Sequence, residues 1–223
     1  MFDRLELLIG KEGLNKLKNS NVLVLGLGGV GGYVTESLVR SGLGNITIVD
    51  FDKIDITNLN RQIIATQNNI GKLKTEEFKK RILAINPTIN IKCINQFIDE
   101  KNIEILFENK IDYLVDACDY LKTKKLIITK CLNKNIPFIT CTGTGNRMDP
   151  SKLRITDIRE TSYDPVAKIL RKYVKEMNIK EKIICLNSTE IPIRKGGIIA
   201  SNSFVPSSAG LLISSFVIKE LLK

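Results

Sequence analysis

Three glycines near the N-terminus have a spacing suited to binding a phosphate group. Gly26, Gly28 and Gly31 give the pattern G-x-G-x-x-G, between the apolar run 22–25 and a segment with helical periodicity. In this pattern the first glycine permits a tight turn, the second lets a phosphate approach the backbone, and the third lets helix and strand pack closely. The helix N-terminus then offers free N–H groups to an anion. Asp50, about twenty residues further on, can accept a hydrogen bond from a ribose hydroxyl. The sequence therefore predicts a nucleotide site.

The polar stretch 51–71 and the lysine that follows it add charged groups to this site. A dinucleotide-binding enzyme needs no clustered cations here, whereas a triphosphate does, because an adenylation reaction must neutralise charge on the departing pyrophosphate. The G-x-x-x-x-G-K-[ST] pattern, which binds phosphates in many ATP-binding proteins, does not occur in the chain. The polar residues that we single out are Asp52, Asn58, Arg61, Gln62 and Lys74. They favour ATP over NAD as the ligand.

Short apolar runs that alternate with helical segments must position these residues. Up to residue 141 strands and helices alternate regularly, which predicts an α/β fold with a Rossmann-like, doubly wound, mostly parallel sheet. Beyond this point we expect a C-terminal extension on the same sheet. The predicted strands are 22–25, 46–49, 89–94, 113–117, 137–141, 153–157 and one or two within 183–193, and the predicted helices are 11–17, 30–41, 72–85, 100–107, 123–132, 164–177 and the segment after Pro206. The loop 51–71 is long enough to be functional.

The chain of 223 residues is predicted to form a single domain. We divide it into an N-terminal helical arm at 1–20, a nucleotide-binding core at 21–145 and a substrate-side extension at 146–223. The net charge of +10 suits a polyanionic partner such as RNA, although many lysines simply solvate a surface. The absence of histidine excludes imidazole chemistry, and five cysteines without a C-x-x-C pair disfavour a disulfide framework and a four-cysteine zinc site.

The closing apolar segment 204–222 is nearly long enough to span a bilayer. It contains Pro206, four serines, Lys219 and Glu220, so we expect a buried helix instead of a membrane span. The N-terminal residues do not have the pattern of a signal peptide. We therefore expect a cytoplasmic protein with no membrane partner.

Five separate motifs occur in an order and spacing that resemble one known superfamily. They are Gly26-x-Gly28-Gly29-x-Gly31, Asp50-x-Asp52, Asn58-x-x-Arg61-Gln62, Lys74 and Asp116-x-x-Asp119. Together they resemble the ThiF/MoeB/HesA superfamily, the adenylating enzymes related to ubiquitin activators. The ATP-binding set that this resemblance implies is Gly26, Gly28, Gly29, Gly31, Asp50, Asp52, Asn58, Arg61, Gln62 and Lys74.

The same resemblance implies roles for individual residues and partners. Asp50 would hold the ribose, and Asn58, Arg61 and Lys74 would contact the phosphates. Asp119 would hold Mg²⁺, which prefers carboxylate oxygen ligands. Arg4 matches the position from which the family reaches into a neighbouring subunit as an arginine finger, which implies a homodimer. The catalytic set is therefore Arg4, Arg61, Lys74 and Asp119. The resemblance also allows a monovalent cation as a cofactor and a sulfur-relay protein as a partner.

The tail is similar to one branch of this superfamily, the tRNA threonylcarbamoyladenosine dehydratases (TcdA or CsdL). The segments that carry the similarity are Gly143-x-Gly145, Asp149-Pro-Ser-Lys152, Thr156-Asp157-Ile158 with Thr161, Asp164-Pro-Val-Ala-Lys-x-Leu-Arg171, Cys185-x-x-Ser188-Thr-Glu190 and Ser203-Phe-Val-Pro-Ser-Ser-Ala-Gly210. The resemblance implies that ATP activates the carboxylate of a threonylcarbamoyl group on the adenosine beside the anticodon, and that loss of water then closes a ring. In two respects the chain departs from its relatives. The zinc-binding cysteine pairs of the ubiquitin-like-protein activators are missing, and the second half is shorter than in longer members of the branch.

A thiol and several basic residues are further candidates. In the ubiquitin-like activators a cysteine after the adenylation core forms a thioester, and Cys185 has the corresponding place, although its apolar neighbours favour a buried structural role. For contacts with tRNA we select three basic clusters, each of which could also be a solvated surface. They are Lys122, Lys124 and Lys125; Arg171, Lys172 and Lys175; and Arg194 with Lys195.

Two other functions stay open at this stage. The first is an activator of a small sulfur-carrier protein of the ThiS/MoaD type, which would adenylate the carrier's C-terminal glycine. The missing zinc-binding pairs and the tail motifs oppose it. The second is an NAD-linked oxidoreductase or a non-catalytic nucleotide sensor, which Arg61, Lys74 and Asp119 oppose because they lie in the register of an adenylating enzyme.

Overall fold

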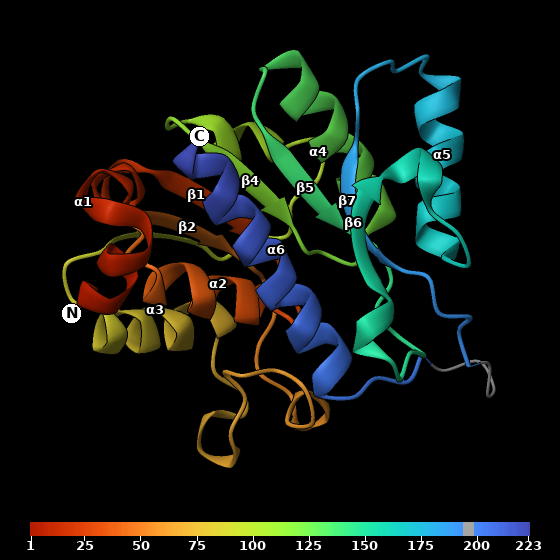
Figure 1. Cartoon of the computed structure of the whole chain (residues 1–223). Coiled ribbons are helices and arrows are strands. Elements are labelled where there is room, and N and C mark those ends of the chain that lie inside the picture. The colour runs from red at the N-terminus through yellow and green to blue at the C-terminus, as the bar shows by residue number, and fades with distance from the viewer. Residues whose placement is uncertain (194–198) are drawn as a thin grey trace.

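A computed structural model describes residues 1–193 and 199–223 of the chain. Within these residues the strands form one sheet in the order β3-β2-β1-β4-β5-β7-β6 (Figure 1). Neighbouring strands pair in parallel, except for β6 and β7, which pair antiparallel at one edge. The strands are β1 (Asn21–Leu25), β2 (Asn45–Val49), β3 (Asn90–Ile94), β4 (Tyr113–Asp116), β5 (Phe138–Cys141), β6 (Leu153–Asp157) and β7 (Ile184–Ser188). The predicted doubly wound sheet is confirmed, and so is its extension by the tail.

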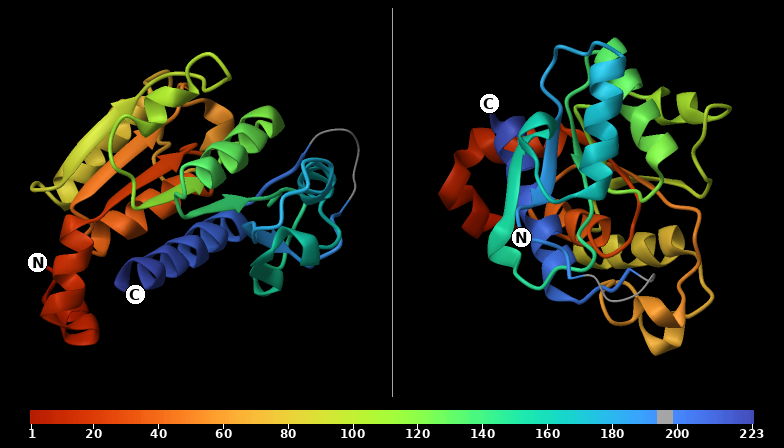
Figure 2. Two further views of the ribbon diagram at one scale, coloured as in Figure 1. Left: turned by 90° about the horizontal axis from the view of Figure 1, so that it is seen from above. Right: turned by 90° about the vertical axis from the view of Figure 1, so that its right-hand side faces the viewer.

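Helices cover both faces of this sheet (Figure 2). The helices α2, α3 and α6 share one hydrophobic core with the sheet, while α4 and α5 belong to a second core. The N-terminal helix α1 lies against α6, where Lys16 Nζ donates a hydrogen bond to the carbonyl of Leu222 at 3.1 Å. The helices are α1 (Asp3–Asn19), α2 (Gly31–Arg40), α3 (Lys74–Ile85), α4 (Leu121–Asn133), α5 (Pro165–Glu176) and α6 (Phe204–Leu222).

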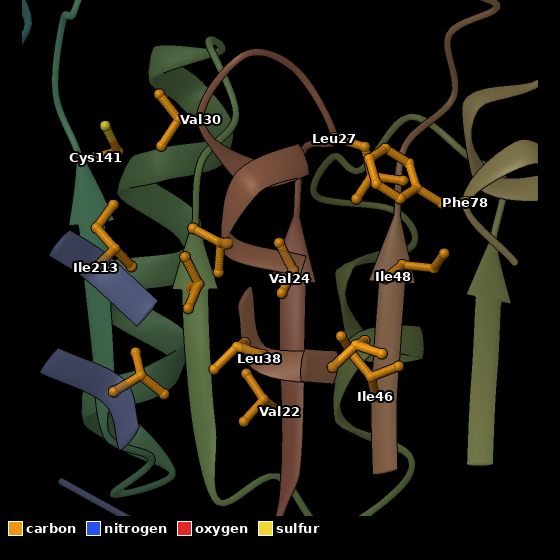
Figure 3. Packing of buried hydrophobic residues seen from close by; sticks show 14 of the residues in the cluster. Val22, Val24, Leu27, Val30, Leu38, Ile46, Ile48, Phe78, Cys141 and Ile213 are labelled. Carbon is orange, nitrogen blue, oxygen red and sulfur yellow. The ribbon is translucent and has the colours of Figure 1, made fainter. Parts of the chain in front are cut away.

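Strand β1 is apolar on both sides because its side chains pack into both hydrophobic cores. Val22 and Val24 belong to the core shared with α2, and Leu23 and Leu25 belong to the core shared with α4. Figure 3 shows Val22 and Val24 beside Leu38 of α2. An unbroken apolar run is typical of such a central strand, and it places the glycine loop directly at the strand's carboxyl end.

Several boundaries differ from the predicted ones. The helix α1 begins at Asp3 and is bent at Gly10, where φ is +74°, whereas Gly13 lies inside the helix and does not break it. The helix predicted at 100–107 is a 3-10 turn, Ile103–Phe107, and 183–193 contains the single strand β7. The last helix begins before Pro206. A proline fits in the first turn because the N–H groups there have no intrahelical partner.

The final helix α6 is part of the core, as predicted for a buried helix. It is long and apolar enough to cross a membrane, yet Val205, Ala209 and Ile213 lie in the core. A Cβ atom on Gly210 would lie 2.5 Å from the carbonyl oxygen of Val30. Because of this glycine, α6 packs directly on the start of α2, a contact that the sequence analysis did not single out.

Candidate active site

A pocket of about 500 Å³ lies at the carboxyl ends of β1, β2, β4 and β5. The chain runs from β1 towards one edge of the sheet through β2 and β3, and returns through β4 and β5 to the other side. Loops leaving β1 and β4 therefore diverge, which is the usual position of a ligand crevice in an open α/β sheet. The predicted ATP-binding residues that line this pocket are Gly26, Gly28, Gly29, Asp50, Asp52, Asn58, Arg61, Gln62 and Lys74.

The glycine loop forms the floor of the pocket. Gly26 has a φ of +90°, and a Cβ there would lie 2.7 Å from the carbonyl oxygen of Ala117. A Cβ on Gly31 would lie 1.8 Å from the carbonyl oxygen of Gly26, so only glycine lets α2 approach the loop so closely. At Gly28 the nearest atom would be Gln62 Nε2, at 3.9 Å. The space above Gly28 is therefore open to a ligand, as the pattern predicts.

Asp50 connects the end of β2 to the glycine loop. Its Oδ2 accepts a hydrogen bond from the Leu27 N–H at 2.7 Å, and its Oδ1 accepts one from the Asp52 N–H at 2.8 Å. Burial raises the pKa of this carboxyl group, and the positive charge of Lys74 partly opposes the rise. Each carboxylate oxygen keeps a further lone pair, so Asp50 has the acceptor capacity that a ribose hydroxyl requires.

The ammonium group of Lys74 is buried between two carboxylates. Its Nζ lies 2.8 Å from Asp52 Oδ2 and 3.8 Å from Asp50 Oδ2. A buried lysine is stable in such a place because the two acidic side chains offset the cost of removing its charge from water. In this structure Lys74 thus pairs with Asp52 and lies near Asp50, the predicted ribose ligand, while its predicted contact with phosphates stays a prediction.

The long loop after β2 carries the other predicted phosphate contacts. Asn58 Oδ1 accepts a hydrogen bond from the Asp55 N–H at 3.1 Å, which closes a small capping box. Arg61 Nη1 donates to the carbonyl of Thr57 at 2.8 Å. Gln62 Oε1 is buried without a hydrogen-bond donor among the described residues. A buried acceptor of this kind normally has a partner, and a donor on a bound molecule could supply it.

Asp119 lines the pocket, and its carboxylate has no partner among the described residues. It is exposed and follows β4, and in the part of the chain that the structure describes it forms no hydrogen bond or ion pair. No cluster of three or more His, Cys, Asp or Glu side chains among the described residues could hold a metal ion by itself. Mg²⁺ commonly combines one or two carboxylates with the phosphates of its substrate. The donor set therefore fits a magnesium ion that a bound nucleotide would help to hold.

An aromatic cluster at the edge of the pocket was not predicted from the sequence. Phe51, Phe97 and Tyr120 follow β2, β3 and β4, and their ring centroids lie 4.7 to 5.9 Å apart. All three rings line the pocket and are partly exposed. Flat apolar rings beside Asp50 are suited to a nucleobase. The signal in the sequence is an aromatic residue shortly after each of three strands, which is visible only once the strand order is known.

A buried aspartate fixes the opposite wall of the pocket. Asp164 Oδ2 accepts hydrogen bonds from Thr142 Oγ1 at 2.5 Å and from the Gly143 N–H at 3.0 Å. Its Oδ1 accepts a bond from the Ala167 N–H at 3.0 Å and so caps α5. The carboxylate thus joins the loop after β5 to the N-terminus of α5. Only the tail motif around Asp164 pointed to this region, and this role was missed.

The structure corrects one predicted tRNA contact and limits another. The prediction for Lys124 is wrong, because only 2% of its surface is exposed and its Nζ lies 3.0 Å from Asp116 Oδ2. Arg171 is only partly exposed, and its Nη1 donates to the carbonyl of Thr161 at 2.9 Å. Lys124 lies on α4 and Arg171 on α5, and the sequence pattern did not show which face of each helix is buried.

The other predicted basic residues have different surroundings. Lys122, Lys172 and Lys175 are exposed. Lys125 Nζ lies 5.2 Å above the centre of the Tyr173 ring, and this contact joins α4 to α5. Both helices begin at the pocket, since Tyr120 and Val166 line it. The remaining two, Arg194 and Lys195, lie outside the described residues.

Two further predictions concern Cys185 and Arg4. Cys185 lies in β7 with no exposed surface, and burial raises the pKa of its thiol to about 12. Such a thiol is inert, so the structure contradicts a thioester role and agrees with a structural one. Arg4 is exposed on α1 and does not line the pocket of its own chain. If Arg4 acts in a pocket, the pocket must therefore belong to another subunit.

The fold and the pocket together define a class of nucleotide-binding α/β protein, and comparison with known proteins identifies the family. Residues 2–187 match the ThiF family. Because the match covers most of the chain, the protein belongs to the ThiF family. This confirms the superfamily inferred from the five motifs.

Similarity to named proteins extends over the whole chain. A tRNA threonylcarbamoyladenosine dehydratase of Bacillus subtilis is 40% identical over 240 residues, which cover 100% of this chain and 94% of that protein. The crystal structure of E. coli tRNA N6-threonylcarbamoyladenosine dehydratase, TcdA, in complex with ATP has a TM-score of 0.94 and 32% identity, covering 99% of this chain and 93% of that one. A molybdopterin-synthase adenylyltransferase of Haemophilus influenzae is 31% identical over 164 residues, which cover 73% of this chain and 66% of that protein.

Proposed function

We propose that this protein is an ATP-dependent tRNA threonylcarbamoyladenosine dehydratase, which activates the threonyl carboxylate by adenylation. The observation that carries the proposal is similarity to dehydratases over the whole chain, tail included. The molybdopterin-synthase adenylyltransferase, which we take to represent the carrier-protein activators, matches a smaller part of the chain. The pocket at the carboxyl ends of β1, β2, β4 and β5 supports the same reading, because its glycine loop and acidic residues suit ATP.

The pocket residues divide the binding of ATP among them. Asp50 accepts the ribose hydroxyls, and the aromatic cluster beside it receives the adenine base. The phosphates lie over Gly28, where the N-terminus of α2 directs N–H groups towards them. Arg61 and Lys74 add positive charge near the departing pyrophosphate. When bound at Asp119, Mg²⁺ would neutralise charge on the phosphates.

The chemistry that follows needs no nucleophile from the protein. A carboxylate oxygen of the substrate attacks the α-phosphorus of ATP, and pyrophosphate leaves. A second atom of the same threonylcarbamoyl group then attacks the activated carbonyl, a ring closes and AMP leaves, with the net loss of one water. Ring closure is favoured because the reacting groups are already joined. The absence of histidine and the burial of Cys185 are therefore compatible with the reaction.

The direct test supplies the purified protein with ATP, Mg²⁺ and tRNA that carries threonylcarbamoyladenosine. The nucleosides are then digested and measured by mass spectrometry. We expect a product lighter by the mass of one water, formed only when ATP is present. No change in nucleoside mass, combined with pyrophosphate formation only after a ubiquitin-like sulfur carrier is added, would instead establish the carrier-protein activator. Titration with NAD and ATP separates both from an NAD-linked protein.

A homodimer is part of the proposal, and exposed apolar side chains on adjacent helices support it. Leu7 and Leu8 on α1 are 89% and 81% exposed, and Leu211 and Leu212 on α6 are 51% and 41% exposed. A second copy of the chain could cover such surfaces. A dimer could also bring Arg4 of one subunit to the pocket of the other.

A mixing experiment tests the arginine finger. We expect Arg4→Ala to slow turnover while ATP binding, measured by calorimetry, stays nearly unchanged. Refolding equal amounts of Arg4→Ala and Asp119→Asn subunits together should restore about a quarter of the wild-type rate, because half of the dimers are mixed and each has one complete site. If Arg4 served its own chain, the mixture would be no more active than the separate variants. Equal losses of ATP binding and turnover in Arg4→Ala would also rule out the finger.

For tRNA we retain four of the lysines selected from the sequence, which lie on α4 and α5 and are exposed or partly exposed, namely Lys122, Lys125, Lys172 and Lys175. Contacts between lysine and phosphate release counterions, which makes binding depend on salt. Replacing both Lys172 and Lys175 by glutamate should raise the KM for tRNA by about tenfold or more and flatten its salt dependence, while ATP affinity stays unchanged. The matched control replaces Lys79 and Lys80 by glutamate, since these exposed lysines lie on the other face of the sheet. Equal effects of the two double variants would contradict a specific tRNA surface.

A cytoplasmic location without a membrane partner, a bound monovalent cation and a sulfur-relay partner are expectations of the same proposal. The division of the chain into arm, core and substrate-side extension also stays a prediction.

A further inference from the structure

A buried charged cluster lies directly behind the wall of the pocket that carries Asp119. Asp116, at the end of β4, has no exposed surface, and Lys124 in the first turns of α4 is 2% exposed. Lys124 Nζ lies 3.0 Å from Asp116 Oδ2 and 3.2 Å from Thr140 Oγ1. The Thr140 hydroxyl donates to Asp116 Oδ2 at 2.6 Å. The cluster therefore joins the ends of two neighbouring strands to one helix.

The other oxygen of Asp116 holds the turn that follows. Its Oδ1 accepts hydrogen bonds from the Cys118 N–H at 3.2 Å and from Cys118 Sγ at 3.0 Å. On its other side this turn abuts the glycine loop, since a Cβ on Gly26 would lie 2.7 Å from the Ala117 carbonyl oxygen. The turn between Asp116 and Tyr120 is thus fixed from two sides, and Asp119 is the exposed residue within it.

Lys124 is what allows a carboxylate to be buried at this point. An unpaired charge in the interior is costly, and removing one partner of a buried pair leaves the other unpaired. Burial would lower the pKa of Lys124, but attraction to Asp116 outweighs this and raises it, so the ammonium stays charged. With the lysine in place all four contacts to Asp116 can form, and a fully satisfied polar network is rigid.

We propose that Lys124 is a positioning residue for the adenylation site. Through Asp116 and Thr140 it holds the turn after β4 so that the Asp119 carboxylate faces the bound phosphates. This inference rests on the proposed function, in which Asp119 acts on ATP. It replaces the direct tRNA contact that the sequence suggested for Lys124, because the ammonium group cannot reach an RNA from its buried position.

Three variants test the proposal. Lys124→Met keeps the volume of the side chain and removes the charge, and Thr140→Val removes one hydroxyl and leaves both charges in place. Lys130→Met, on the same helix with a half-exposed side chain paired to Glu104, is the control. For each variant we would measure the Tm, the Mg²⁺ dependence of ATP binding by calorimetry, and the kcat and KM for tRNA.

The expected pattern separates positioning from RNA contact. Supporting groups of metal-binding carboxylates typically change metal affinity or activity by about 10–100-fold. Lys124→Met should lower kcat by about 100-fold and raise the Mg²⁺ needed for half-maximal ATP binding by about tenfold, with the KM for tRNA unchanged. Thr140→Val should move both quantities in the same direction by about fivefold to tenfold while its Tm stays near wild type. Lys130→Met should match the wild type.

Two results would overturn the inference. One is a folded Thr140→Val variant with wild-type kcat and wild-type Mg²⁺ dependence. The other is a Lys124→Met variant whose only change is a higher KM for tRNA, which would mean an RNA contact. Because the Mg²⁺ dependence of ATP binding needs no tRNA, it tests positioning even if the wild-type protein failed to dehydrate threonylcarbamoyladenosine.

Discussion

Replacing Gly31 by alanine is expected to destabilise the protein and abolish ATP binding together. The new Cβ would lie 1.8 Å from the carbonyl oxygen of Gly26, a backbone atom that no rotamer change can move. The start of α2 must shift away from the loop, and α6 with it, because Gly210 packs on Val30. Overpacking of this kind costs roughly 3 kcal/mol, which should lower the Tm by roughly 10 °C in a chain of this length. Differential scanning calorimetry and ATP titration measure the two effects.

Gly28→Ala provides the matched comparison for this prediction. At Gly28 a Cβ would come no closer than 3.9 Å to another atom, Gln62 Nε2, so we expect the Tm to stay within a few degrees of wild type. ATP affinity should nevertheless fall by about 100-fold, because the added methyl group occupies the space of a phosphate. Normal ATP affinity in Gly28→Ala would place the phosphates elsewhere in the pocket.

The second large effect is expected for Asp119→Asn, which should lower the rate of pyrophosphate formation by about 10³-fold. A carboxylate that helps to hold Mg²⁺ stabilises the developing charge on the pyrophosphate by several kcal/mol, and about 4 kcal/mol corresponds to this change in rate. The side chain is exposed and has no partner among the described residues, so the Tm should not change. Rapid-quench measurement of pyrophosphate, with saturating ATP and tRNA, isolates the adenylation step.

Glu100→Gln is a suitable control because Glu100 is also exposed and acidic but does not line the pocket. It should turn over at the wild-type rate. A rate for Asp119→Asn within about threefold of this control would remove Asp119 from the catalytic account, since a lost metal ligand costs far more. A large drop in Tm would assign the residue a structural role.

The sequence predicted the sheet well because its signals are local. Apolar runs such as 22–25 and 113–115 are continuous since both faces of the central strands are buried. Helix ends were less accurate. The predicted helix 11–17 starts too late, because the bend at Gly10 does not end α1. Gly13 packs against Ile9 and against Leu222, and no local pattern indicates this contact with the far end of the chain.

The candidate site was partly visible in the sequence for a similar reason. Motif spacing placed the glycines, Asp50 and Asp119 around one pocket, and the structure brings them together there. Motif spacing alone could not reveal contacts between segments that are distant in the sequence. The pairing of Lys124 with Asp116 depends on which face of α4 turns inward. The hydrogen bond from Thr142 to Asp164 depends on the place at which α5 begins beside the end of β5. A lysine-rich helix offers no local signal that one of its lysines is buried.

An isotope-transfer measurement tests the central claim, adenylation of the substrate carboxylate, most directly. The tRNA would carry a threonylcarbamoyl group whose carboxylate oxygens are replaced by the heavy isotope of oxygen, and the nucleotide products would be analysed by mass spectrometry. Attack of the carboxylate on the α-phosphorus predicts AMP that carries one heavy oxygen atom for each cyclised nucleoside, with unlabelled pyrophosphate. Heavy oxygen in inorganic phosphate together with ADP would show phosphorylation instead, and unlabelled AMP beside a cyclised product would show that the carboxylate is never adenylated.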